Sequence, residues 1–231
     1  MPSPSLFTTL RIQSGRVLLA DLHEGRLREG AERFGLVWDG DLRAALAPVA
    51  SDGDDLRVRI VLTATAPPQV AAAPYAEPAR PWRCVPVPCS QTPAAVAYKT
   101  TARAEYARAR AAAGDADDAL LIGHDGRLLE TTIANVFVLD EHGTLATPPA
   151  SDALLPGLVR RRILEQWPQT AERSLFTADL ASARAVVATN ALFLAHAIGQ
   201  VEGVARFESD ALARDLKVFL RSHDPEFRII T

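Results

Sequence analysis

Two of the 25 basic residues in this 231-residue chain are lysines, Lys99 and Lys217, and the others are arginines. An arginine stays protonated in a protein, whereas a lysine amine can lose its proton and form a Schiff base with an aldehyde. Lys99 is followed along the chain by Glu130, by Asn135 and by Gly157, which lies at a predicted helix start. Codon bias accounts for the many arginines but not for a lysine placed upstream of these groups. The pattern predicts covalent chemistry at Lys99.

These residue types match what pyridoxal phosphate requires of a protein. The cofactor needs a lysine for its Schiff base and a carboxylate that keeps its pyridine nitrogen protonated. Lys99 and Glu130 have the two required side chains. Pyridoxal phosphate is therefore the predicted cofactor, and a small-molecule amine is the predicted substrate.

A phosphate group is best held by the amides of a helix N-terminus and by an arginine. Pro156 is predicted at the first position of a helix that ends near Trp167, so the amides of Leu158 and Val159 are candidate phosphate donors. Arg26, on a predicted helix near the N-terminus, is the candidate arginine, although a solvated helix residue would read the same way.

Three spaced segments then carry a family resemblance: Glu130-x-Thr132-x-x-Asn135-Val136-Phe137, Leu145-x-Thr147 and Leu155-x-Gly157-Leu158-x-Arg160. Together they resemble the signature of class IV aminotransferases, the fold-type IV pyridoxal-phosphate enzymes, which include branched-chain and D-amino-acid aminotransferases and 4-amino-4-deoxychorismate lyases. His23-x-x-Arg26-Leu27 resembles the family's phosphate-binding arginine motif. The resemblance extends from residue 6 to about residue 205. It implies a two-domain α+β or α/β enzyme with a small α/β domain, a larger pseudo-barrel domain and a homodimeric assembly.

The resemblance also assigns roles to residues. Lys99 would be the catalytic residue, and the cofactor-binding residues would be Arg26, Lys99, Glu130, Asn135, Leu155, Leu158, Val159, Asn190, Ala191 and Leu192. Leu155 would pack on the pyridine ring, a role that core packing would mimic. Asn135 is better explained by bonds to local backbone groups than by direct cofactor contact. The amides of Ala191 and Leu192 would form a second phosphate loop.

Three short features favour the lyase branch of the family. They are the run Phe7-Thr8-Thr9, Arg103 four residues after Lys99, and the loop of residues 190–192. The substrate-binding candidates are Phe7, Thr8, Thr9, Arg59 and Arg103, where Arg59 is either an exposed residue of an alternating strand or a ligand of a substrate carboxylate.

A lyase would convert 4-amino-4-deoxychorismate to 4-aminobenzoate, a folate precursor, and pyruvate. Ala64-Thr65 stands where many members carry an Arg-Gly that binds a substrate carboxylate, so the substrate is less well defined than the cofactor. One alternative is an aminotransferase acting on branched-chain or D-amino acids. A second is a degenerate paralogue that binds the cofactor without catalysis.

The bulk composition excludes several other function classes. A net charge of −3 and a pI near 6.0 argue against a nucleic-acid or membrane partner. No apolar run approaches the length of a bilayer span, and the N-terminus lacks the pattern of a signal peptide, so a cytoplasmic location is expected. Cys84 and Cys89 are too few for a zinc site and are expected as reduced thiols, although one disulfide between them is possible.

Proline density predicts the domain boundary. Eight of the chain's 16 prolines lie between Pro67 and Pro93, which excludes a regular helix and limits any strand there to a sheet edge. We therefore expect a small domain over residues 1–91 and a larger cofactor-binding domain over 92–231. Strands are expected over 6–12, 17–19, 56–63 and 185–189, and helices over 21–34 and from Thr100 or Thr101 to Gly114. Hairpins are expected around Gly126 and Gly143.

Overall fold

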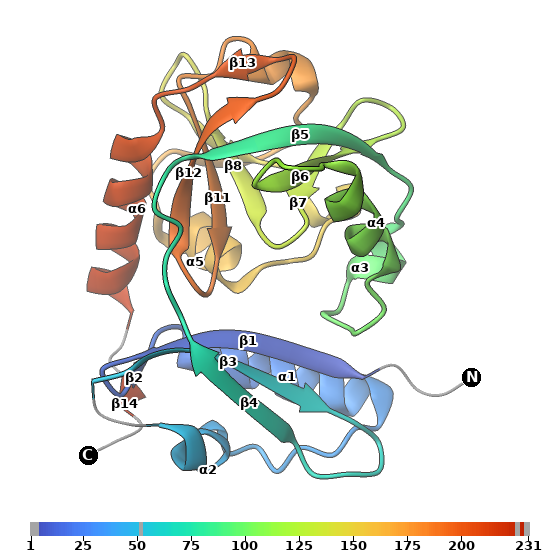
Figure 1. Ribbon diagram of the computed structural model, residues 1–231, viewed down its shortest axis with the longest axis vertical. Coiled ribbons are helices and arrows are strands. Elements are labelled where there is room, and N and C mark those ends of the chain that lie inside the picture. The colour runs from blue at the N-terminus through green and yellow to red at the C-terminus, as the bar shows by residue number, and fades with distance from the viewer. Residues whose placement is uncertain (1–4, 51–52, 225–226, 229–231) are drawn as a thin grey trace. The chain divides into compact units, whose positions relative to one another are not determined.

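The computed structural model describes residues 5–50, 53–224 and 227–228 (Figure 1). The chain divides into two compact units, which are treated separately below. Unit 1 comprises Met1–Glu77, Tyr98–Ala102 and His223–Thr231, and unit 2 comprises Pro78–Ala97 and Arg103–Ser222.

Unit 1 is an antiparallel sheet with helix α1 packed on one face. Its strands run in the order β14-β2-β1-β3-β4. Their bounds are Phe227–Arg228 for β14, Arg16–Val17 for β2, Leu6–Gln13 for β1, Asp55–Leu62 for β3 and Gln69–Pro74 for β4. The helices are α1 (Ala20–Phe34), α2 (Leu42–Leu46) and the short 3₁₀ helix η1 (Ala47–Val49).

The core of unit 1 follows from the alternation of its strands. Leu6, Leu10 and Ile12 of β1 are fully buried and pack with the buried residues of β3 and with Leu27 of α1. Successive strand residues point to opposite faces, so Phe7, Thr9 and Arg11 lie on the other face of the sheet. Helix α1 ends where the sequence predicts, because Gly35 adopts the left-handed conformation that a helix C-terminus requires.

Unit 2 is built on a nine-stranded sheet that closes on itself. The order is β10-β9-β8-β11-β12-β5-β6-β7, with β13 on β12, and a further pairing of β7 with β8 closes six strands into a barrel. The strands are β5 (Trp82–Cys89), β6 (Asp118–Gly123), β7 (Leu128–Thr131), β8 (Asn135–Leu139), β9 (Leu145–Thr147), β10 (Thr170–Glu172), β11 (Ala185–Asn190), β12 (Leu194–Val201) and β13 (Ala205–Arg206).

Helices surround this barrel, whose interior is filled by residues such as Leu120, Val136, Val186 and Ile198 (Figure 1). The helices are α3 (Pro93–Val96), α4 (Ala104–Ala112), α5 (Leu158–Gln166), α6 (Asp210–His223), and the 3₁₀ helices η2 (Ala150–Asp152) and η3 (Thr177–Leu180). Helix α4 packs on β5 and β6, and α5 packs on β11. The two-domain fold with a small sheet domain and a barrel domain is therefore as expected.

The division of the chain differs from the predicted 1–91 and 92–231. Strand β5 belongs to unit 2, where it pairs in parallel with both β12 and β6, so it is not the edge strand that its prolines predict. The described pairing with β12 ends at Cys84, and Pro86 and Pro88 follow it. Proline is tolerated in such a stretch, which the described pairing joins to β6 and not to β12.

Lys99 belongs to unit 1 rather than to the barrel unit. Its backbone oxygen accepts a hydrogen bond from the Phe7 amide at 2.8 Å, and the Thr101 amide donates to the Ser5 oxygen at 2.9 Å. These bonds hold the segment along β1 in an extended form. The following helix α4 consequently begins at Ala104, with Arg103 as its N-cap, and not at Thr100 or Thr101.

Cys84 and Cys89 are both buried free thiols. Cys84 lies in the barrel interior, while Cys89 packs outside it with residues of α4. Burial raises the pKa of both thiols, so they remain protonated. Across the described ranges, no helix combines the length and apolar composition needed to cross a membrane.

Candidate functional site

A buried carboxylate organises one side of unit 2. Glu130, near the end of β7, is 3% exposed and accepts three hydrogen bonds. The donors are the Tyr106 hydroxyl at 2.6 Å, the Leu155 amide at 3.0 Å and the Asn135 side-chain amide at 3.1 Å. A buried carboxylate needs such donors to keep its charge. Glu130 is thus held as a fixed, hydrogen-bonded anion.

The sequence after Glu130 forms the tight connection between β7 and β8. Glu130 pairs directly with Asn135, and the Thr131 hydroxyl accepts the Ala134 amide at 3.0 Å. The Thr132 hydroxyl donates to the buried carboxylate of Asp118, whose pKa is raised chiefly by burial. The residues of the run 130–137 therefore have the spacing of a tight hairpin, and polar side chains of the run form hydrogen bonds that hold it together.

Tyr106 is a site residue that the sequence reasoning missed. Its hydroxyl bonds to Glu130, and burial together with the negative charge of Glu130 raises its pKa, so it acts as a donor. The Arg103 guanidinium lies 3.8 Å from the centre of the Tyr106 ring and donates to the Thr132 oxygen at 2.6 Å. Arg103 is thus in contact with the surroundings of Glu130. The sequence does contain a signal for Tyr106, since it is three residues after the candidate residue Arg103 and residues at this spacing are neighbours on a helix.

Asn135 fixes the start of α5. Its side-chain amide donates to the Leu155 backbone oxygen at 2.8 Å as well as to Glu130, so it bridges β8, the end of β7 and the segment before α5. A Cβ on Gly157 would overlap the Asn135 side-chain oxygen. Only glycine therefore allows the chain to approach this closely.

Gly157 and not Pro156 marks the helix start. Gly157 is the N-cap of α5, and the Arg161 amide makes the first intrahelical bond to its oxygen at 2.9 Å. Pro156 was expected at the first helical position, but the close contact with Asn135 moves that position to Leu158. The amides of Leu158 and Val159 lie in the first turn, where the N–H groups have no intrahelical acceptor and the helix dipole favours an anion.

The turn after β11 fits its expected role only in part. The Asn190 side-chain oxygen accepts the amides of Leu192 at 2.9 Å and Phe193 at 3.2 Å. The Leu192 amide is therefore engaged within the turn, and its prediction as a phosphate donor was wrong. The reason is the preference of asparagine for bonding to backbone amides just after it. Ala191 is left as the candidate donor of this loop.

Thr189 lies on the same face of the barrel wall as Asn135. Thr189 pairs with Asn135 across β11 and β8, so both side chains lie on one face. The Thr189 hydroxyl is buried, and no hydrogen-bond partner for it is present in the described part of the chain. Such an atom fits a site whose polar ligand completes the bonding.

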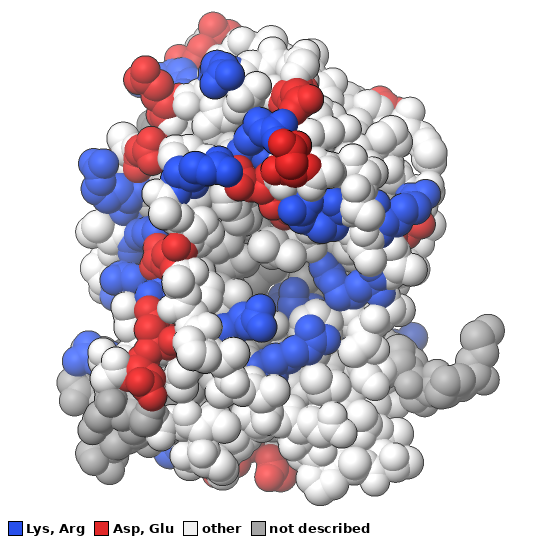
Figure 2. Space-filling view, viewed as in Figure 1, with Lys and Arg blue, Asp and Glu red and all other residues white. Residues whose placement is uncertain are grey.

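In unit 1, cations gather around Phe7. The Lys99 amine lies 5.0 Å from the centre of the Phe7 ring, and the Arg59 guanidinium lies 3.7 Å from it. Arg59 pairs with Thr9, which places both on the Phe7 face of the sheet. In Figure 2, basic side chains are visible over the strands of this unit, where Arg57 and Arg59 of β3 are exposed. This face suits an anionic ligand.

Thr8 has a different environment from its neighbours. It is fully buried on the α1 side of the sheet, and its hydroxyl lies 2.7 Å from the Nδ1 atom of His23. The expectation that Thr8 contacts substrate was wrong, because strand alternation separates it from Phe7 and Thr9.

The buried side chain of His23 has a strongly lowered pKa. Burial, and then the positive charges of Arg26 and Lys99, lower the pKa of His23 to about 3. The imidazole is therefore neutral near pH 7. The charges of the candidate phosphate arginine and of the candidate reactive lysine thus both favour the neutral form of this ring.

The residues fit the requirements of pyridoxal phosphate. Unit 1 contains the amine of Lys99 and the guanidinium of Arg26, while unit 2 contains Glu130, the first turn of α5 and the orphaned Thr189 hydroxyl. Among the residues that the structure describes, no cluster of three or more potential metal ligands is present.

Comparison with known proteins agrees with this reading. The model of the family "Amino-transferase class IV" matches residues 5–201. A protein of Schizosaccharomyces pombe described as "Putative aminodeoxychorismate lyase" is 28% identical over 176 residues, which cover 71% of this chain and 75% of the other.

Solved structures share the fold. A "Putative 4-amino-4-deoxychorismate lyase" of Legionella pneumophila superposes with a TM-score of 0.81 at 23% identity, covering 95% of this chain and 91% of that one. The pyridoxal-phosphate-bound form of a hypothetical aminotransferase from Mycobacterium tuberculosis gives 0.79 at 21% identity, with 95% and 88% covered. At these identities the likeness establishes the fold alone.

We predict that Gly157→Ala weakens pyridoxal phosphate binding at least tenfold. The added methyl displaces the Asn135 side chain, which disturbs its bonds to Glu130 and Leu155 and costs about 1–3 kcal/mol of stability. Spectroscopic titration with the cofactor and thermal unfolding measure the two effects. Gly25→Ala is the control, because a Cβ there meets nothing within 4 Å. Equal cofactor affinity in both variants would contradict the role given to Gly157.

We predict that His23 makes the protein sensitive to acid. Below about pH 6.5 the unfolded chain protonates this side chain while the folded chain, with a pKa of about 3, does not. Stability from this group is therefore complete above pH 6.5 and falls by about 1.4 kcal/mol per pH unit toward pH 3. Imidazole NMR at pH 5 is expected to show a neutral His23 in the folded protein. The slope of unfolding free energy against pH is expected to lessen in His23→Gln and to persist in the exposed control His124→Gln.

Proposed function

Because the chain belongs to the class IV aminotransferase family, we propose that it is a pyridoxal-phosphate-dependent lyase that converts 4-amino-4-deoxychorismate to 4-aminobenzoate and pyruvate. The observation that carries the lyase assignment is the cationic surface beside the reactive lysine. Arg59 stacks on Phe7 at 3.7 Å, and the Lys99 amine lies 5.0 Å from the same ring. The substrate has two carboxylates, and a guanidinium held on an aromatic face is suited to bind one of them.

Two further observations support the lyase over its relatives. Arg103, which the resemblance associates with lyases, is fixed by its bond to Thr132 and its stack on Tyr106. The curated relative in Schizosaccharomyces pombe and a structural neighbour in Legionella pneumophila both carry a lyase name.

We propose the following roles for these residues toward the cofactor. Pyridoxal phosphate, when bound, withdraws electrons from the carbon that bears the substrate nitrogen. Glu130 would hold the proton on the pyridine nitrogen, because three donors fix the carboxylate in place. Arg26 and the amides of Leu158 and Val159 would bind the phosphate.

Lys99 would also move the proton of the reaction. Its amine takes the proton from the ring carbon that bears the nitrogen, and the bond between the ring and the enolpyruvyl oxygen then breaks. The ring becomes aromatic, and the released enolate takes up a proton on carbon to become pyruvate. Atoms balance without water or a second substrate. Thr9, on the Phe7 face, is the threonine in position to assist, since Thr8 is buried.

The aminotransferase alternative differs in what it needs. An aminotransferase acting on branched-chain or D-amino acids requires a keto acid to complete its cycle and releases no pyruvate from aminodeoxychorismate. Ala64-Thr65 stands where many family members carry an Arg-Gly, which indicates an altered carboxylate site and is compatible with this alternative. The proposal also includes a homodimer, the assembly that the family resemblance implies.

We predict that the purified protein with pyridoxal phosphate forms 4-aminobenzoate and pyruvate in equal amounts from aminodeoxychorismate, without a keto acid. Lys99→Arg keeps the positive charge but cannot lose its proton, so we expect activity to fall at least a thousandfold. A coupled pyruvate assay measures both. Amino transfer to a keto acid without pyruvate release would establish the aminotransferase instead. Cofactor binding without either reaction would indicate a degenerate paralogue.

We predict that Tyr106→Phe lowers kcat/KM about 10- to 100-fold. The change removes the hydrogen bond of 2.6 Å to buried Glu130, and leaving such a group short of a donor costs about 1–3 kcal/mol. Tyr75→Phe is the matched control, because the Tyr75 hydroxyl is buried and has no hydrogen-bond partner within the described residues. Equal kinetics for the two variants would show that Tyr106 does not support Glu130.

A further inference from the structure

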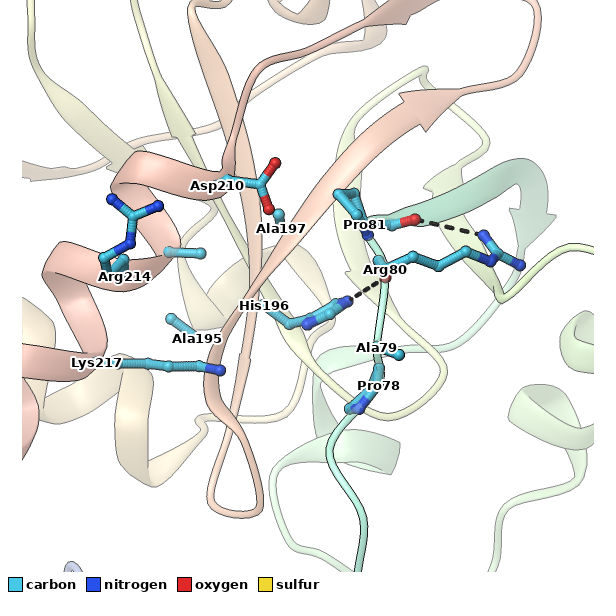
Figure 3. A pocket seen from close by; sticks show the side chains of 11 residues that line it. Pro78, Ala79, Arg80, Pro81, Ala195, His196, Ala197, Asp210, Arg214 and Lys217 are labelled. Carbon is cyan, nitrogen blue, oxygen red and sulfur yellow. Dashed lines mark hydrogen bonds between the residues drawn. The ribbon is translucent and has the colours of Figure 1, made fainter.

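The second lysine of the chain lines a cavity that the proposed reaction does not use. Lys217 lies on α6, and the cavity has a volume of about 270 Å³ between α6, β12 and residues 78–81 (Figure 3). All of its lining residues belong to unit 2. None of them is among the residues given a role in the reaction, so the inference below is independent of the proposed function.

The walls of the cavity are small and apolar. The lining includes prolines and alanines from three separate segments, namely Pro78, Ala79, Pro81, Ala195, Ala197 and Ala213. Short side chains at these positions leave the space that larger ones would fill. The volume is just below the roughly 300–1,000 Å³ of cavities that hold drug-sized ligands, so it suits a small metabolite.

The charged groups on the lining are mostly cationic. Lys217 and Arg214 come from successive turns of α6, with Asp210 one turn earlier. Figure 3 shows the Lys217 side chain extending from α6 toward β12, the strand that carries His196. Two long cationic side chains against one short carboxylate favour an anionic ligand.

The remaining polar groups are already committed. The Arg80 guanidinium forms a two-bonded pair with Asp117 at 2.9 Å, and its side chain points away from Lys217 in Figure 3. The Arg80 backbone oxygen accepts a hydrogen bond from the Nε2 atom of His196 at 3.0 Å. His196 is 7% exposed and packs on Trp82, with 5.0 Å between ring centres. This wall is therefore tied together by hydrogen bonds and ring contacts, and the other charged side chains of the lining lie on α6.

We propose that this cavity binds a small carboxylate with a compact apolar body, its charge held by Lys217 and Arg214 and its body packed on the prolines and alanines. A phosphate without an apolar body would leave those walls uncovered. Ala195 lines the cavity and pairs with Thr189 of β11, so the bound carboxylate would contact the strand pair next to the Asn190 turn.

Benzoate is the probe, and binding to the full chain is measured by calorimetry. We expect a dissociation constant of the order of a millimolar, at least tenfold weaker binding to Lys217→Met, and restored binding in Lys217→Arg. Benzamide, which lacks the charge, and acetate, which lacks the apolar body, are both expected to bind at least tenfold more weakly than benzoate.

Two controls locate the site. Arg221→Met removes an exposed cation one turn further along α6 that does not line the cavity, and Arg59→Met removes the cation beside Phe7 in unit 1. Both are expected to keep the Lys217-dependent binding of benzoate. Unaltered affinity in Lys217→Met, equal affinity for benzamide, or loss of binding in Arg59→Met would overturn the proposal. Failure of the lyase assay would leave these expectations unchanged.

Discussion

The burial of one carboxylate is the constraint on which the arrangement of unit 2 depends. Glu130 is almost inaccessible to solvent, and a charge in that position is stable only when its oxygens are hydrogen-bonded. Its three donors come from α4, from β8 and from the segment before α5. Elements that are distant in the sequence must therefore meet at one point. A carboxylate held in this way is also a fixed charge, which is what a protonated ring nitrogen requires of its partner.

The start of α5 follows from the same constraint. Asn135 pairs with Glu130 across the hairpin, bonds to the Leu155 backbone and leaves no room for a side chain at Gly157. The helix N-terminus is thereby set against the carboxylate by a side-chain bridge and a missing Cβ. The distance between Glu130 and the first turn of α5 is therefore set by the Asn135 bridge, which joins both to one side chain.

In unit 1 the corresponding constraint is the pleat of β1. Phe7 and Thr9 lie on the face that also carries Arg59, while Thr8 lies on the buried face against His23. Burial keeps His23 neutral beside two cations, so the small unit holds Lys99 and Arg26 near an uncharged ring that does not compete with them for an anion. Three consecutive residues are thus divided between the buried face of the sheet and the face that carries Arg59.

The sequence alone determined the family and most strands, because these rest on local patterns: residue spacing, alternation and glycine positions such as Gly35. Only the tertiary structure decided that Tyr106 supports Glu130 and that the Leu192 amide is taken by Asn190, because both depend on side chains meeting in space. It also decided that proline-bearing β5 is an interior strand, since the extent of pairing on each side is not local information. Lys99 belongs to unit 1 for the same reason, because Phe7, whose amide bonds to its backbone oxygen, is distant from it along the chain.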